Sequence, residues 1–157
     1  QGRSWYGLLK EMPEEKMDEL WNVHVKTPVL LIQKLQDKLV QNPFSRIIFV
    51  GSIYGKSGSA MEVFYSTLKG ALESFVKSYA KEVATLGLTV NLIAPGAIKT
   101  GLLKDFTQDE LENLTLEIPL LRLGKPEEIA YFVGVCASEK ASYLTGSIQY
   151  VTGGWLN

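Results

Sequence analysis

Two short apolar runs stand out in the chain: Arg46-Ile47-Ile48-Phe49-Val50 and Leu88-Thr89-Val90-Asn91-Leu92-Ile93-Ala94. They are too short for helices, and the first is β-branched and aromatic without any polar alternation, which is typical of a strand buried on both faces of a parallel sheet. A third run, Ser147–Val151, ends at Gly153-Gly154. We expect three strands of one parallel sheet.

Helical patterns separate these runs. Proline and two acids open a pattern that runs from Met12 to Gln41, where Asn42-Pro43 stops it. Further helices are expected over 60–86, with Gly87 as the C-cap, after the capping-box pair Thr107 and Glu110, and from Pro126 to Ala137. Helices that alternate with buried strands indicate an α/β fold, here a single domain over residues 1–157.

Composition excludes several classes of function. The 157 residues include 16 basic and 17 acidic side chains, so no basic surface for nucleic acid or anionic membrane is expected. No apolar run approaches the ~20 residues of a membrane-spanning helix. Cys136 is the only cysteine and His24 the only histidine, which excludes an internal disulfide, thiolate metal clusters, histidine zinc sites and most hydrolytic triads. We expect no metal and a reducing, cytoplasmic compartment.

The glycine-rich loop over 51–59 resembles two phosphate-binding motifs without matching either. A P-loop needs four residues between its glycines, whereas three separate Gly51 from Gly55-Lys56-Ser57. The spacing of Gly51, Gly55 and Gly58 is also not that of a dinucleotide fingerprint. The simpler interpretation is that these residues turn the chain, and a nucleotide triphosphatase is a distant alternative.

Tyr65 and Lys69 lie four residues apart at the start of the expected long helix, so their side chains share one face. A neighbouring ammonium lowers the pKa of a phenol toward neutrality, as a general acid/base requires. Ser52 follows the first strand, at the sheet edge where ligands of parallel sheets bind, and its hydroxyl can hydrogen-bond a substrate carbonyl. Taken singly, each residue also fits a plainer role, a solvated helix face or a turn serine.

The order of polar and turn residues along the chain is more specific than any one of them. Asn22 precedes Ser52, Tyr65 and Lys69, and the second strand is followed by Pro95-Gly96-Ala97-Ile98-Lys99-Thr100. Together these residues resemble the classical short-chain dehydrogenase/reductase family, and most closely its 3-oxoacyl-carrier-protein reductases. The closing segments agree: Arg122-Leu123-Gly124-Lys125-Pro126-Glu127-Glu128, Tyr143-Leu144-Thr145-Gly146 and Gly153-Gly154-Trp155.

The resemblance implies a Rossmann-like doubly wound sheet, an NAD or NADP cofactor, and roles for the matching residues. Tyr65 would be the general acid/base, Lys69 would lower its pKa and hold the nicotinamide ribose, and Ser52 would orient the carbonyl. Asn22 would hold a water that links Lys69 to solvent. Ile98 and Thr100 would contact the carboxamide, with Pro95 and Gly96 shaping that wall, and residues 101–121 would form a mobile lid.

The chain departs from the family pattern in what precedes Gly51. Family members begin with a strand, a glycine loop and a helix that hold the adenine half of the cofactor, and nothing here matches them. The Arg46–Val50 strand would then lie bare at the sheet edge. We therefore expect an N-terminal half of about 80–100 further residues in the functional protein.

Smaller departures concern the substrate. Reductases of carrier-bound substrates often place basic residues where this chain has Pro43 and Leu86, which weakens that assignment. A pocket flanked by Tyr54, Glu62, Val63 and Phe64 would be partly aromatic.

The first hypothesis is an oxidoreductase that interconverts a small-molecule carbonyl and its alcohol by hydride transfer. The alternative is a non-catalytic module or fragment of the same fold that cannot hold cofactor. By analogy with the family, the helices over 25–39 and 60–86 are expected to form a homodimer or homotetramer.

Overall fold

The computed structural model describes residues 4–42, 44–103 and 106–155. Three strands form its sheet: β1 (Arg46–Val50), β2 (Thr89–Pro95) and β3 (Ile148–Val151). The α-helices are α1 (Glu14–Trp21), α2 (Thr27–Leu39), α3 (Tyr54–Ser57), α4 (Val63–Val83), α5 (Gln108–Glu117) and α6 (Pro126–Ala137). A π-helical turn, η2 (Asn22–Lys26), joins α1 to α2, and short 3₁₀ turns cover Leu9–Glu11, Ala84–Leu86, Gly101–Leu103 and Glu139–Ala141.

The sheet has the order β1-β2-β3 and both pairings are parallel, as the sequence predicts. Phe49 pairs with Leu92, and Leu92 pairs with Ile148, so one row of apolar residues crosses all three strands. The buried Asn91 amide donates to Leu144 O (2.8 Å) and accepts from Ser147 N (3.1 Å). This side chain therefore fixes where β3 begins.

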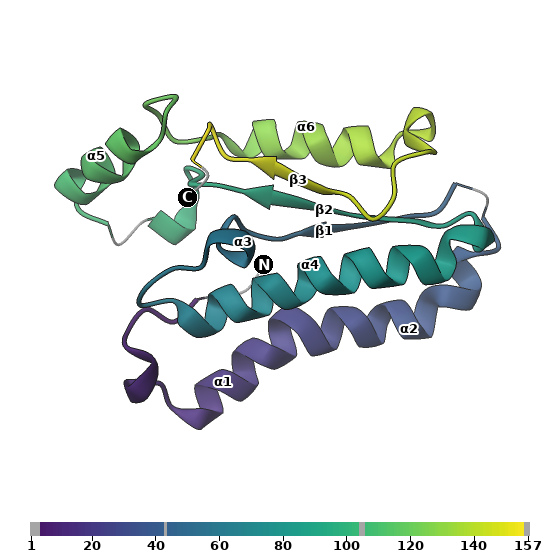
Figure 1. Cartoon of the computed structure of the whole chain (residues 1–157), viewed down its shortest axis with the longest axis horizontal. Coiled ribbons are helices and arrows are strands. Elements are labelled where there is room, and N and C mark those ends of the chain that lie inside the picture. Colours follow the sequence, from purple (N-terminus) through teal and green to yellow (C-terminus); the bar gives the residue numbers. More distant parts are fainter. Residues whose placement is uncertain (1–3, 43, 104–105, 156–157) are drawn as a thin grey trace.

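Helices cover both faces of the sheet (Figure 1). On one face α2 and α4 lie side by side, and their apolar residues Ile32, Leu72, Val76 and Val83 pack on Phe49, Val90 and Leu92. On the other face α6 supplies Ile129 and Cys136, which pack on Ile93. The alternation of Leu92 and Ile93 between the two faces is the period-two pattern of a strand between two helical layers.

Local signals in the sequence explain the helix boundaries. Thr107 and Glu110 make the predicted capping box at the start of α5, and Pro126 occupies the first turn of α6. Gly87 ends the long α4 segment with a φ of 75°, in the left-handed region that glycine enters without a Cβ clash.

Two expectations need correction. The pattern from Met12 to Gln41 is not one helix, because η2 interrupts it. β1 is not fully buried: of its five residues only Phe49 is, and the others are half-buried, since β1 lies at the edge of the described sheet. β1 therefore has the apolar pattern of a central strand, but β2 is its one neighbouring strand among the described residues. No helix in the described ranges is both long and apolar enough to cross a membrane.

Candidate active site

The carboxyl ends of the three parallel strands meet at the end of the molecule that also carries α3 and α5 (Figure 1). Strand pairing continues past β1 into the loop, because Gly51 N donates to Ile93 O (2.7 Å) and Ile53 N donates to Pro95 O (2.9 Å). Ser52 is held between these two bonds. The loop that carries the serine is thereby fixed against the end of β2.

Tyr65 and Lys69 project from the first turns of α4 toward this loop. Ser52 lies close enough to Tyr65 to lower the pKa of its hydroxyl, and the Ser52 hydroxyl accepts from Tyr54 N at 3.2 Å. The buried Lys69 ammonium lies 5.3 Å from the centre of the Tyr65 ring and donates to Val50 O at 3.4 Å. The structure therefore brings together the serine, tyrosine and lysine that the sequence singled out.

The electrostatics of this cluster differ from the expectation. Burial, together with the charge of Glu62, raises the pKa of Tyr65 to about 12, although Ser52 acts in the opposite direction. Burial also lowers the pKa of Lys69 to about 8. Removal from water is the largest influence on Tyr65 in the described chain, so the lowering of its pKa that the sequence led us to expect from Lys69 is not seen there.

A second buried contact, one helical turn after Lys69, joins α4 to the sheet. The Tyr150 hydroxyl of β3 donates to the Glu73 carboxylate at 3.0 Å, one turn along α4 from Lys69. Gly55 approaches the same turn so closely that a Cβ would lie 2.9 Å from the Lys69 carbonyl carbon and 3.0 Å from Glu73 Oε1. Only glycine fits there, so Gly55 allows this loop to pack closely against α4.

Lys56, the lysine of the P-loop-like stretch, packs on an aromatic ring of β3. Lys56 Nζ lies over the Tyr150 ring, 4.9 Å from its centre, where a cation–π contact holds it.

Asn22 lies in η2, where Thr27 N donates to Asn22 O across five residues. Such π-helical turns are rare and occur frequently at functional sites. Asn22 is exposed, whereas His24 from the same turn is buried with its ring edge-on to Tyr65, at 5.4 Å between centres. No local pattern in the sequence predicts this contact of His24 with Tyr65, because it depends on the π-helical turn.

The residues expected to form the cofactor wall follow β2. Gly96 N donates to Val151 O (3.0 Å), and a Cβ on Gly96 would meet Thr152 Cα at 2.9 Å, so glycine is required where the two strand ends converge. Ile98 bridges to Gly124, and Lys99 N donates to Gly124 O at 2.9 Å. Pro95, Gly96 and Ile98 thus lie at the same sheet edge as Ser52, and Thr100 is exposed beyond them.

Comparisons with known proteins agree with this geometry. Residues 2–156 match a family model described as enoyl-(acyl carrier protein) reductase. The chain is 44% identical over 154 residues to an oxidoreductase of Bacillus subtilis, YmfI, and 37% identical over 149 residues to the 3-oxoacyl-[acyl-carrier-protein] reductase FabG of Rickettsia conorii. A crystal structure of a short chain dehydrogenase family protein from Francisella tularensis superposes with a TM-score of 0.92 at 25% identity.

This chain belongs to the short-chain dehydrogenase/reductase family. The matches cover 98% of the chain for the Bacillus protein and 95% for the Rickettsia protein, but 64% and 62% of those relatives' own lengths. The structural match covers 98% of this chain and 67% of the Francisella one. The fold class is confirmed as the Rossmann-like α/β arrangement of that family.

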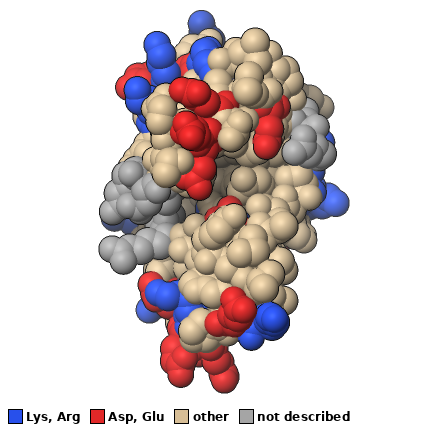
Figure 2. Space-filling model, turned by 90° about the vertical axis from the view of Figure 1, so that its left-hand side faces the viewer, with Lys and Arg blue, Asp and Glu red and all other residues tan. Residues whose placement is uncertain are grey.

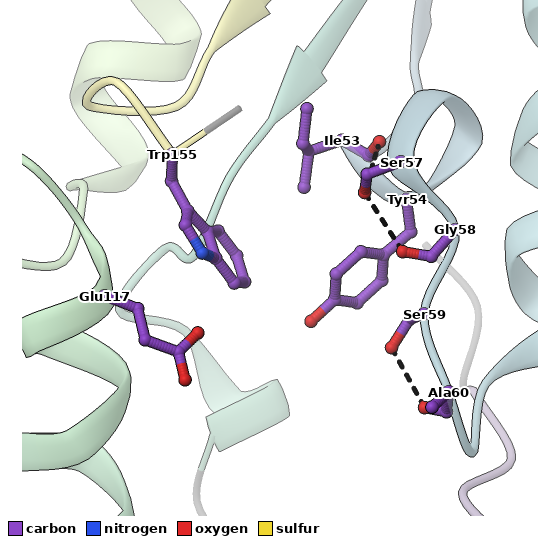
Figure 3. A pocket seen from close by; sticks show the side chains of 8 residues that line it. All are labelled: Ile53, Tyr54, Ser57, Gly58, Ser59, Ala60, Glu117 and Trp155. Atoms are coloured by element: carbon purple, nitrogen blue, oxygen red, sulfur yellow. Dashed lines mark hydrogen bonds between the residues drawn. The ribbon is translucent and has the colours of Figure 1, made fainter. Parts of the chain in front are cut away.

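In this short-chain dehydrogenase/reductase, a cavity of about 340 Å³ opens beside the loop that follows Ser52 (Figure 3). Its lining comes from the loop after β1, from α5 and from the segment after β3, and consists of Ile53, Tyr54, Ser57, Gly58, Ser59, Ala60, Glu117 and Trp155. Of the residues expected to flank a pocket, Tyr54 lines this cavity, and Trp155 adds a second aromatic side chain. Glu117 and Trp155 were missed as site residues, since nothing local in the sequence brings them to this loop.

Three other residues expected to flank the pocket lie outside this lining. Phe64 packs with Met12 and Leu20 under α1, Val63 is exposed, and Glu62 lies at the N-cap of α4. The expected lid over 101–121 contains α5 and, just after that helix, the buried Ile118, which packs on Ile53 and Trp155. Two lid residues, 104 and 105, and Pro43 lie outside the described residues.

Proposed function

We propose that the whole protein is an oxidoreductase that interconverts a carbonyl and a hydroxyl by hydride transfer with NAD or NADP, and that Tyr65 is its general acid/base. The observation that carries the proposal is the cluster of Ser52, Tyr65 and the buried Lys69 at the carboxyl ends of parallel strands, with the Lys69 ammonium 5.3 Å from the centre of the Tyr65 ring. The names of the relatives favour a 3-oxoacyl compound as the substrate.

The residues present fit a nicotinamide cofactor. The Lys69 ammonium can donate three hydrogen bonds, and its one acceptor here is Val50 O at 3.4 Å, which leaves donors for a ribose diol. Pro95, Gly96, Ile98 and Thr100 would form the wall against the nicotinamide. When bound, the cofactor supplies the hydride.

The remaining steps belong to this chain's own side chains. Ser52 donates a hydrogen bond to the substrate carbonyl oxygen and orients it. Tyr65 donates its proton to that oxygen as the alkoxide develops, and a tyrosine whose pKa is about 12 enters the step fully protonated at neutral pH. Lys69 stabilises the phenolate left behind, and Asn22 connects Lys69 to solvent for the return of the proton.

Replacement of Tyr65 by phenylalanine tests the assignment. Tyr65→Phe keeps the ring that packs on His24 and removes only the proton donor. We expect kcat for carbonyl reduction to fall by about 10²- to 10⁴-fold, the usual contribution of general acid catalysis. Consumption of NADH or NADPH by the whole protein measures this rate.

Tyr143→Phe is the matched control, because Tyr143 is fully exposed and should tolerate the same change. Equal urea midpoints would show that both variants fold. Undiminished turnover by Tyr65→Phe would exclude the proposed role. Absence of hydride transfer by the unmodified protein with either cofactor would instead favour the second hypothesis, a non-catalytic module of the same fold.

We also propose that the protein assembles as a homodimer or homotetramer through α2 and α4. Leu30, Leu31 and Leu35 on α2 are all more than a third exposed, as are Val63 and Leu86 at the two ends of the α4 segment. Neighbouring exposed leucines on one helix, such as those of α2, form an apolar patch that is typical of a protein interface. The symmetric partner would be a second copy of this chain.

A further inference from the structure

Two side chains from different elements contact the Tyr65 ring. On the same helix, α4, the Lys69 ammonium lies over the ring at 5.3 Å from its centre. From η2, the His24 imidazole meets the ring edge-on, with 5.4 Å between the ring centres and 84° between the ring planes. This separation and this angle are those that aromatic pairs prefer. Of the two neighbours, lysine has a flexible stem, whereas the imidazole is a rigid ring.

The packing of η2 fixes where the His24 imidazole lies. His24 is 4% exposed, and the next residue, Val25, is also buried. Val25 belongs to an apolar cluster with Leu20 of α1 and Leu68 of α4, so it anchors the turn in the core. The imidazole of His24 therefore cannot leave the Tyr65 ring unless η2 unpacks from α4.

The position of the Tyr65 hydroxyl is not determined by α4 alone. A tyrosine in a helix can adopt either of two χ1 rotamers, which carry its hydroxyl to different places. Figure 2, which looks onto the end of the molecule that carries α3 and α5, shows a hollow with acidic side chains above it. Because this end is open to solvent, the contacts that hold the ring come from the protein side, where η2 lies.

We propose that His24 is a positioning residue for Tyr65, whose buried ring keeps the tyrosine in the rotamer that directs its hydroxyl toward Ser52 and the substrate carbonyl. The inference rests on the proposed function for the role of Tyr65. His24 acts through the Tyr65 ring, so it affects the proton-transfer step and leaves substrate binding unchanged. A displacement of about 1 Å at a reacting group can cost about 10²-fold in rate.

Two substitutions of His24 test the role of its ring. His24→Ala removes the ring, and His24→Phe places an aromatic ring at the same position. The whole protein is assayed with NADH or NADPH and ethyl acetoacetate. We expect kcat to fall by about 10- to 100-fold in His24→Ala with KM changed by less than about twofold, and most of kcat to return in His24→Phe. An unchanged kcat in His24→Ala, or no recovery in His24→Phe, would overturn the proposal.

Val25→Ala is the matched control for loss of packing in the same turn. Val25 is 8% exposed, and its apolar cluster does not include Tyr65. The urea midpoint should fall in both alanine variants, whereas kcat should fall only in His24→Ala. An equal loss of kcat in Val25→Ala would mean that loosening of η2 is sufficient, and it would refute the role of the ring. If His24→Ala does not fold, His24→Val takes its place, because valine fills more of the buried space but has no ring.

A spectroscopic measurement separates this inference from the proposed function. The ring resonances of Tyr65, assigned by their loss in Tyr65→Phe, lie in the ring current of His24. They should shift in His24→Ala and stay in place in Val25→Ala. Turnover by the unmodified protein, with both the resonances and kcat unmoved in His24→Ala, would keep the proposed function and refute the positioning role. A shift without any turnover by the unmodified protein would refute both and leave only the packing contact.

Discussion

The burial of Lys69 changes how readily this side chain holds its proton. An ammonium that is 5% exposed has lost most of its hydration, and this loss lowers its pKa from 10.5 to about 8. The fold therefore holds a lysine that loses its proton more readily than in water, one helical turn from a tyrosine that loses its proton less readily. The pKa values of Lys69 and Tyr65 depart from their ordinary values because the packing of α4 on the loop after β1 buries both side chains.

This burial predicts a pH-dependent stability difference between the unmodified protein and Lys69→Met. Between pH 8 and 10.5 the unfolded lysine binds a proton and the folded one does not, so the stability contributed by this residue rises with pH. Lys69→Met lacks that rise. We expect the stability of the unmodified protein relative to the variant to increase by about 2 kcal/mol from pH 7 to pH 10.

Urea unfolding at both pH values measures this difference. The titration of Tyr65 is common to the two proteins and cancels in the comparison. A difference between the two proteins that stays constant with pH would contradict the lowered pKa of Lys69.

Among the helices and strands, those with local signals could be predicted and those set by distant contacts could not. β1 was predicted with its observed bounds, and the starts of α5 and α6 follow from Thr107 and Pro126. Periodicity could not reveal η2, because the apolar residues from Met12 to Gln41 recur only at roughly helical spacing, which does not separate a π-helical turn from a regular helix. Trp155 and Tyr54 are about a hundred positions apart in the chain, and they meet only because β1 and β3 pair with β2 in one sheet.

The same distinction between local signals and distant contacts applies to the candidate site. Ser52, Tyr65 and Lys69 carry a spacing that the sequence displays, and the structure places them in one cluster. Their proton affinities were not predictable, since burial of Tyr65 depends on the packing of η2 and Glu62 around it. The roles of all these residues stay predictions until turnover is measured.

Two glycines in α-helical surroundings should respond oppositely to alanine. Gly87 has a φ of 75° with open space around its Cα, so Gly87→Ala should destabilise the protein by about 1–2 kcal/mol through backbone strain alone. Gly134 lies inside α6 with equally open space, so Gly134→Ala should stabilise it by about 0.5–1 kcal/mol. Urea midpoints of the two variants give both signs, and a shift in the same direction would contradict this account of the α4 terminus.

For the molecule as a whole, the apolar layer of α2 governs association. Leu31 is 56% exposed at the middle of α2, so Leu31→Glu would bury a carboxylate in the proposed interface between copies. We expect the mass from light scattering to fall toward that of the monomer. Leu116→Glu, on the exposed side of α5 at the other end of the molecule, is the control and should leave the mass unchanged (Figure 1). An unchanged mass for Leu31→Glu would place the interface elsewhere.

The π-helical turn η2 also sets the rotational phase between two helices. One additional residue turns the helix by about 100°, so α1 and α2 direct different sides toward α4 than an unbroken helix would. Deletion of a single residue from 22–26 would restore a regular helix and swing the side chains of α1 around by that angle. The buried His24 would then leave the Tyr65 ring. The length of this segment, more than its composition, is therefore what keeps the tyrosine enclosed.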